Sequence, residues 1–299
     1  MSTPAETGHG PWLVTLDVDG TILRSDETAS EEVIEQVRRI SAAGHQVMLA
    51  TGRSPATTVP VVEYLGITPQ FLVCSNGAIV MRRDPNAPAG YRREWAECFD
   101  PTDVLQTISG HLPKARFAVE DERGHYRYTE PFPDTTIGAG AKQVTFDELL
   151  HRQATRVVVV SPDHDMVDFL GVVERMGLHR VSYFIGWTAW LDIAAEGVNK
   201  ATAMERVRIE LGIPRERVLA VADGRNDIEL LTWAAERGRG VAMGHSPADL
   251  LAVANEVTGT VSEDGLAEAL ATLCRPSGCG DVSTPAGCPA ASFRGSECD

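Results

Sequence analysis

Two carboxylates stand two residues apart near the amino terminus, in the segment Asp17-Val18-Asp19-Gly20-Thr21. They come directly after an apolar run, residues 12–16, which is typical of a buried strand. Gly20 supplies the backbone freedom for a sharp turn where that strand ends. A carboxylate attacks phosphorus when a cation screens its charge, and a second carboxyl can protonate the leaving oxygen. The segment therefore predicts a phosphoryl-transfer enzyme.

More polar segments stand at the ends of predicted elements. Thr51-Gly52-Arg53 follows one apolar run, and Asp223-Gly224-Arg225-Asn226-Asp227 follows a later one. Lys200 stands near the start of a helix that we expect from Asn199 to Leu211. Open α/β sheets bind their ligands at the carboxyl ends of the strands. We therefore expect these segments to converge at one edge of a single sheet.

The elements between these segments alternate strand and helix. Ser30 is expected to cap a helix that ends at Gly44. The expected strands are residues 12–16, 47–50, 71–74, 191–193, 218–222 and 240–243. Near-continuous apolar runs indicate a sheet that is covered on both faces. The pattern predicts an α/β fold with a Rossmann-like parallel sheet and right-handed crossovers.

The pattern changes from about residue 83 to residue 187, where short strands and helices mix and residues 157–160 are the clearest strand. Residues 85–90 are typical of a linker or a hairpin loop. The predicted domains are a core of residues 1–84 and 189–273, an inserted α/β cap of residues 85–188, and a disordered tail of residues 274–299.

The tail holds Cys274, Cys279, Cys288 and Cys298 in a stretch rich in Gly, Pro and Ser. Their spacing does not match paired zinc knuckles. We interpret them as incidental thiols, and a redox or metal role is the alternative.

Composition limits the partners of the chain. A net charge of −15 over 299 residues argues against a nucleic acid or an anionic membrane as partner. The sequence shows no apolar stretch that could span a bilayer, and its first ten residues lack the features of a signal peptide. We therefore expect a cytoplasmic protein, and both a monomer and a dimer stay open.

The ordered set of DVDGT, TGR, Lys200 and DGRND resembles the haloacid dehalogenase-like superfamily of phosphatases. The Ser75–Ala78 turn, the inserted domain and Ala242-Met243-Gly244 resemble its Cof-type branch, which includes phosphatases of sugar phosphates and related small molecules. The resemblance covers roughly residues 12–273. It implies a Rossmann-like core with a cap that closes over the substrate.

The resemblance also implies roles in catalysis. Asp17 would be the nucleophile and a ligand of Mg²⁺. Asp19 would be the general acid and base, and its backbone carbonyl would face the metal. Thr51 and the amide of Gly52 would hold phosphoryl oxygens. Fixed donors suit this task because charge spreads over the phosphoryl oxygens in the transition state.

Four further roles follow from the resemblance. Lys200 would neutralise the nucleophile and the transferring group, and Asp223 would bind Mg²⁺ together with Asp17. Asn226 would complete the phosphate surroundings and Asp227 those of the metal. Mg²⁺ suits such a site because it prefers oxygen ligands and keeps some of its waters.

Purely structural interpretations compete with these roles. Thr51 could cap the helix that follows it, and Lys200 could be a solvated helix lysine. Asp227 could be an acid at a helix start, where the helix dipole favours it. Arg53 is expected to be a solvated surface residue rather than a substrate clamp.

Some positions depart from the family pattern. Ala222 replaces a glycine before the metal-binding aspartate, and we expect slight crowding there. Arg225 places a cation near the metal loop, where it binds a second substrate anion or points to solvent. His245 and Ser246 stand where Asn-Ala is common and change the local hydrogen bonding.

The predicted function is Mg²⁺-dependent hydrolysis of small phosphorylated metabolites, such as sugar phosphates, through an aspartyl-phosphate. One alternative is a phosphotransferase or phosphomutase that passes the same phosphoryl group to another hydroxyl. The other is a non-catalytic module that binds a phosphorylated ligand. A dehalogenase is disfavoured because that reaction needs neither a metal nor a second acid.

Overall fold

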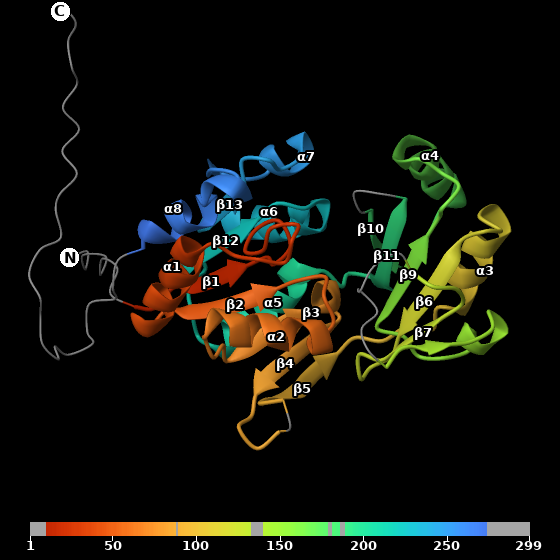
Figure 1. The fold of residues 1–299 in the computed structure, drawn as a ribbon, viewed down its shortest axis with the longest axis horizontal. Helices are drawn as coiled ribbons and strands as arrows, with labels where there is room; N and C mark the ends of the chain where they lie inside the picture. The colour runs from red at the N-terminus through yellow and green to blue at the C-terminus, as the bar shows by residue number, and fades with distance from the viewer. Residues whose placement is uncertain (1–9, 88, 133–139, 179–180, 186–188, 274–299) are drawn as a thin grey trace, which may run out of the picture.

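The computed structural model describes residues 10–87, 89–132, 140–178, 181–185 and 189–273. The predicted tail, with its cysteines, lies outside these residues. The described residues form two units, each built on one sheet (Figure 1). None of their helices has the length and apolar character that a membrane span requires.

The first sheet has eight strands with β1 in its interior. From edge to edge the order is β14 (Glu256–Val257), β13 (Arg239–Ala242), β12 (Val218–Ala222), β1 (Leu13–Leu16), β2 (Gln46–Ala50), β3 (Phe71–Cys74), β4 (Ile79–Arg83) and β5 (Tyr91–Ala96). The pairs from β14 to β3 are parallel. β4 and β5 add an antiparallel hairpin, so the segment expected to be a linker or a hairpin loop joins two paired strands.

Helices cover both faces of this sheet. One face packs against α1 (Glu31–Ala42), α2 (Pro55–Leu65) and α8 (Gly265–Ala271), and the other against α5 (Lys200–Glu210), α6 (Ile228–Ala235) and α7 (Ala248–Leu251). Along β1, Val14 and Leu16 face the first set while Leu13 faces the second. Every residue of β1 is buried, which is why the strand reads as a continuous apolar run. The predicted α/β fold is confirmed.

Side-chain caps fix where the helices begin. Ser30 accepts a hydrogen bond from the Val33 amide at 3.1 Å, as predicted for the start of α1. At α5, Asn199 accepts from the Thr202 amide at 2.9 Å, and the Thr202 hydroxyl accepts from the Asn199 amide at 3.2 Å. This capping box fixes Lys200 as the first residue of the helix.

The second sheet has six strands in the order β10 (Val181–Ile185), β11 (Trp190–Ala195), β9 (Arg156–Val160), β6 (Arg116–Glu120), β7 (Tyr126–Tyr128) and β8 (Lys142–Gln143). All its pairs are antiparallel except β7 with β8. Its helices α3 (Thr102–His111) and α4 (Met166–Met176) lie on the face away from the first sheet (Figure 1).

Sheet membership bears on the domain boundaries predicted at 84/85 and 188/189. β5 is hydrogen-bonded into the first sheet, although it lies within the predicted cap. β11 is hydrogen-bonded into the second sheet, although it lies within the predicted core. We therefore propose that the core and the cap meet near residues 97 and 196.

Candidate active site

The ammonium group of Lys200 lies between two carboxylates. Its Nζ is 2.6 Å from Asp17 Oδ1 and 2.7 Å from Asp227 Oδ1. Asp17 follows β1, and Asp227 ends the turn Arg225–Asp227 after β12. Lys200 and both carboxylates are buried. The structure thus brings together three segments that are distant in the chain, and the interpretation of Lys200 as a solvated helix lysine is wrong.

Burial and crowding set the charges at this point. Burial raises the pKa of Asp17, Lys200 opposes that rise, and nearby carboxylates add to it. Burial likewise raises the pKa of Asp227 to about 6, against the opposing effect of Lys200. Burial alone would lower the pKa of Lys200, but Asp17 and Asp227 raise it above its ordinary value. The lysine is charged, and it is outnumbered by the carboxylates around it.

Asp223 lies against the loop that carries Asp17. Its Oδ1 accepts a hydrogen bond from the Thr21 hydroxyl at 2.8 Å, and its Oδ2 lies 3.5 Å from His245 Nε2. Gly20 has a φ of +86°, and a Cβ there would lie 2.2 Å from Asp223 Oδ2. Only a residue without a side chain allows this approach, which explains the glycine of the first motif.

Arg53 binds Asp19, a contact that the sequence analysis missed. Its Nε is 2.9 Å from Asp19 Oδ2, and its Nη2 is 2.5 Å from Asp19 Oδ1. The interpretation of Arg53 as a solvated surface residue is therefore wrong. The hydrogen bond to Asp19 raises the pKa of Arg53. The signal available in the sequence was an arginine directly after Thr-Gly at a strand end.

The loop after β2 is held by its own backbone. The Thr51 amide donates to the Val73 carbonyl at 2.9 Å, and the Thr51 carbonyl accepts from the Asn76 amide at 3.0 Å. The Thr51 hydroxyl accepts from the Arg53 amide at 3.1 Å. The residue at the N-cap position of α2 is Ser54, so Thr51 does not cap that helix.

Asn76 links two loops of the site. It lies in the short turn Ser75–Gly77 after β3, with a φ of +53°. Its Oδ1 accepts a hydrogen bond from Asn226 Nδ2 at 2.9 Å, and it lies next to Gly52. The predicted phosphate-binding residues Thr51, Gly52 and Asn226 thus surround one residue that the sequence analysis used only for the family resemblance.

The carboxylates suit a magnesium ion in number and kind. In the described part of the chain, no three His, Cys, Asp or Glu side chains are grouped as a metal-holding cluster. Mg²⁺ does not require one, because it is usually bound through one or two carboxylates and keeps several waters. Asp17 and Asp223 could supply that pair, because the Asp223 carboxylate lies close enough to raise the pKa of Asp17. Asp227, also predicted as a metal ligand, accepts hydrogen bonds from Lys200 at 2.7 Å and from the Gly224 amide at 3.3 Å.

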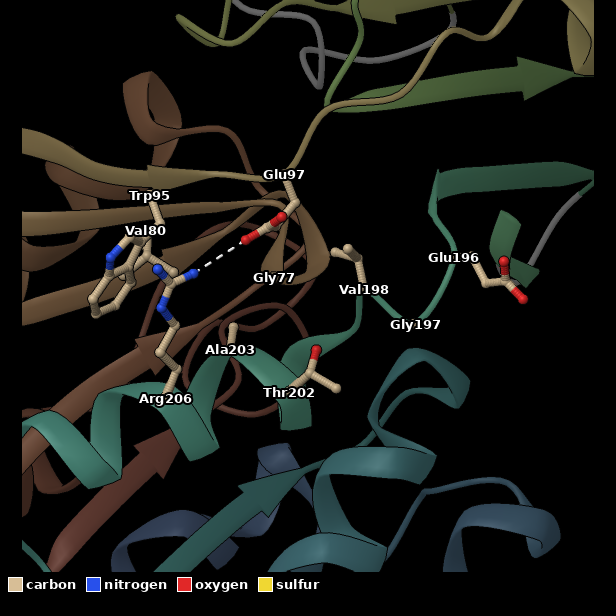
Figure 2. Close-up of a pocket in the computed structure, with 10 residues that line it drawn as sticks. All are labelled: Gly77, Val80, Trp95, Glu97, Glu196, Gly197, Val198, Thr202, Ala203 and Arg206. Atoms are coloured by element: carbon tan, nitrogen blue, oxygen red, sulfur yellow. Dashed lines mark hydrogen bonds and ion pairs between the residues drawn. The ribbon is translucent and has the colours of Figure 1, made fainter. Parts of the chain in front are cut away.

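A cavity of about 260 Å³ is lined by none of the predicted site residues. Its walls come from β4, β5 and α5 of the first unit, and from Glu97 and Glu196–Val198, where the chain passes between the two units. Figure 2 shows the Arg206 side chain beside Trp95 and joined to Glu97. Its guanidinium lies 4.2 Å from the centre of the Trp95 ring, and its Nη1 lies 3.1 Å from Glu97 Oε1. The cavity shares no lining residue with the carboxylate cluster.

A family model described as haloacid dehalogenase-like hydrolase matches residues 14–270. The chain belongs to the haloacid dehalogenase-like hydrolase family. It is 26% identical over 270 residues to 5-amino-6-(5-phospho-D-ribitylamino)uracil phosphatase YitU of Bacillus subtilis, covering 87% of this chain and 96% of the relative. It is 27% identical over 269 residues to pyridoxal phosphate phosphatase YbhA of Escherichia coli, covering 86% and 96%.

Solved structures share the fold. The subclass IIB sugar phosphatase BT4131 of this superfamily superposes with a TM-score of 0.73 at 20% identity, covering 87% of this chain and 98% of that one. BT1666 from Bacteroides thetaiotaomicron gives a TM-score of 0.69 at 21% identity, covering 90% and 97%. The predicted family, the Rossmann-like α/β fold with a cap, and the phosphatase class of enzyme are confirmed.

Proposed function

We propose that this chain is a Mg²⁺-dependent phosphatase of small phosphorylated metabolites, with Asp17 as the residue that accepts the phosphoryl group. The observation that carries the proposal is the buried lysine shared by Asp17 and Asp227, with Asp223 held against the same loop. The relatives named for ribitylaminouracil and pyridoxal phosphates support a small phosphorylated metabolite as substrate.

In the first half of the reaction, an oxygen of Asp17 attacks phosphorus and the bond from phosphorus to the ester oxygen breaks. The leaving alkoxide takes a proton from the carboxyl of Asp19. Asp19 is exposed toward solvent, whereas Asp17 is buried. Burial suits Asp17, because a nucleophile must be held in place. Exposure suits Asp19, because a general acid must exchange its proton with the substrate and with water.

In the second half, water attacks phosphorus of the aspartyl-phosphate. Asp19, now a carboxylate, accepts the proton of that water, and the bond from phosphorus to Asp17 breaks. Phosphate leaves, and both aspartates return to their starting states. Arg53 bonds both oxygens of Asp19, an arrangement that suits the carboxylate form in which Asp19 accepts the proton of the water.

Fixed groups stabilise the charge on the phosphoryl oxygens. Lys200 supplies a buried positive charge next to the nucleophile, and Asp227 holds that lysine in place. The Thr51 hydroxyl, the Gly52 amide and the Asn226 side chain are proposed as donors to the phosphoryl group. Preorganised donors in a dry site supply most of the catalysis in phosphoryl transfer.

Mg²⁺ would be held by the carboxylates of Asp17 and Asp223 and by the backbone carbonyl of Asp19. When bound, it screens the repulsion between Asp17 and a phosphate dianion. The excess of carboxylates over cations around Lys200 is the feature of this structure that such an ion would relieve.

The test is release of phosphate from an aryl phosphate with Mg²⁺ and with a chelator. Release should require the metal and should be abolished by Asp17→Asn, while Asp103→Asn, at an exposed position of α3, should leave it unchanged. Turnover that survives Asp17→Asn would refute the nucleophile assignment. Product analysis with an added sugar acceptor separates hydrolysis from phosphoryl transfer to a second hydroxyl.

A further inference from the structure

The face of the cap sheet opposite α3 and α4 carries a buried ion pair. Arg156 on β9 and Asp192 on β11 form a fork, with Nε–Oδ1 and Nη2–Oδ2 distances of 2.6 and 2.7 Å. The side chains are 4% and 14% exposed. Burying an ion pair is costly unless its geometry is well satisfied. The Arg156–Asp192 pair is satisfied by further contacts of both side chains.

The remaining nitrogen of Arg156 reaches from the cap to the core. Its Nη1 donates to the Gly52 carbonyl at 2.6 Å and to the Tyr126 hydroxyl at 3.0 Å. The Gly52 carbonyl and the Arg53 amide belong to one planar peptide unit. That amide is the group that donates to the Thr51 hydroxyl at 3.1 Å. Holding the carbonyl from the cap therefore fixes the direction of the amide that orients Thr51.

Asp192 extends the same pair to the other side of the site. Its Oδ2 lies 3.5 Å from Asn76 Nδ2, which makes this the longest link of the chain of contacts. Asn76 in turn accepts from Asn226 at 2.9 Å. The pair thus touches the loop after β2 directly and reaches the loop after β12 through one residue.

We propose that Arg156 and Asp192 are positioning residues through which the cap sets the geometry of the phosphate-binding loops. The proposal rests on the proposed function, because it assigns Thr51, Gly52 and Asn226 to the phosphoryl group. Arginine suits the task because its planar fork satisfies a carboxylate while a further nitrogen bonds a carbonyl in a fixed direction. A lysine would keep the charge, but its three donors cannot reproduce the four contacts of Arg156 in their directions.

The experiment compares kcat and KM for an aryl phosphate, and inhibition by orthovanadate, in matched variants. Arg156→Lys should lower kcat by about tenfold or more with KM within about twofold, because the loop donors that it misaligns bind the phosphoryl oxygens most strongly in the transition state. Vanadate inhibition should weaken in parallel. Arg116→Met is the control, because that cap arginine also donates to a carbonyl, that of Pro131 at 2.6 Å, within the cap. It should change neither constant.

The double variant Arg156→Met with Asp192→Leu guards against loss of folding, because it removes both charges of the pair while the buried Glu120 beside it, whose pKa burial raises to about 7, can take up a proton. It should fold, by circular dichroism and thermal unfolding, and show the same fall in kcat. Asp192→Asn and Asn226→Ala should be non-additive in kcat, because the first acts through the second.

The possible outcomes separate the two proposals. Wild-type turnover with unchanged kcat in Arg156→Lys and in the folded double variant would overturn the positioning role alone. A rise in KM without a fall in kcat would overturn it as well, because the pair would then contribute only to ground-state binding. A wild-type protein that releases no phosphate would overturn the proposed function, and the positioning role with it.

Discussion

Replacing Lys200 by methionine tests the charge balance of the site. The substitution keeps the length of the side chain and removes a fully buried ammonium group that lies 2.6 and 2.7 Å from two carboxylates. Removing one member of a buried ion pair costs about 3–5 kcal/mol, because its partner is left uncompensated. Domains are stable by only about 5–15 kcal/mol. Lys200→Met should therefore lose a large part of the free energy of unfolding.

The same variant should lose catalysis. A single fixed group that stabilises developing charge is worth about 10²–10³-fold in kcat, and we expect a loss of at least that size. A second variant separates the two effects. Lys200→Met with Asp227→Asn removes one of the stranded charges, so it should recover at least half of the lost stability without recovering kcat.

Urea unfolding followed by tryptophan fluorescence gives the free energies, and steady-state release of phosphate gives kcat. A double variant as unstable as Lys200→Met would show that Asp227 is not the carboxylate that the lysine balances. A Lys200→Met enzyme with kcat within tenfold of the wild type would refute the catalytic role of the lysine. Glu148→Gln, at an exposed position of the cap, serves as a charge-changing control.

Two further predictions concern a buried carboxyl and a glycine. Burial raises the pKa of Glu120 to about 7, above its ordinary 4.5; its favourable contribution is thus complete below about pH 4.5 and lost as pH rises through 7. The unfolding free energy of Glu120→Gln, relative to that of the wild type, should therefore rise by up to about 3 kcal/mol from pH 5 to pH 8. The same difference between the two proteins at both pH values would contradict this. Gly20→Ala would place a Cβ 2.2 Å from Asp223 Oδ2, so the Mg²⁺ concentration for half-maximal activity should rise about tenfold. An unchanged Mg²⁺ dependence would show that Asp223 does not hold the metal from this position.

The convergence of the motifs could be predicted from the sequence, because parallel strands bring their carboxyl ends to one edge. Asp17 follows β1 and Asp227 follows β12, and β1 and β12 are neighbours in the sheet. The apolar runs located both strands. The helix expected from Asn199 to Leu211 begins at Lys200 in the structure, one residue later, because Asn199 is its capping residue.

Other features depend on contacts that local patterns do not encode. The strand predicted at residues 191–193 falls within the predicted core, but it belongs to the cap sheet, where its apolar residues Leu191 and Ile193 are buried. Apolarity reports burial and does not say which sheet buries the strand. The contact of Arg53 with Asp19 and that of Arg156 with Gly52 join residues 34 and 104 positions apart. They arise only once the loops and the two units are placed against one another.

The most direct measurement asks whether the phosphoryl group passes through Asp17. Enzyme quenched during turnover of an aryl phosphate is treated with borohydride, which reduces an aspartyl-phosphate to homoserine, and its peptides are analysed by mass spectrometry. The account predicts homoserine at position 17 that depends on substrate and Mg²⁺. Active enzyme that carries the modification at another residue, or at none, would contradict it.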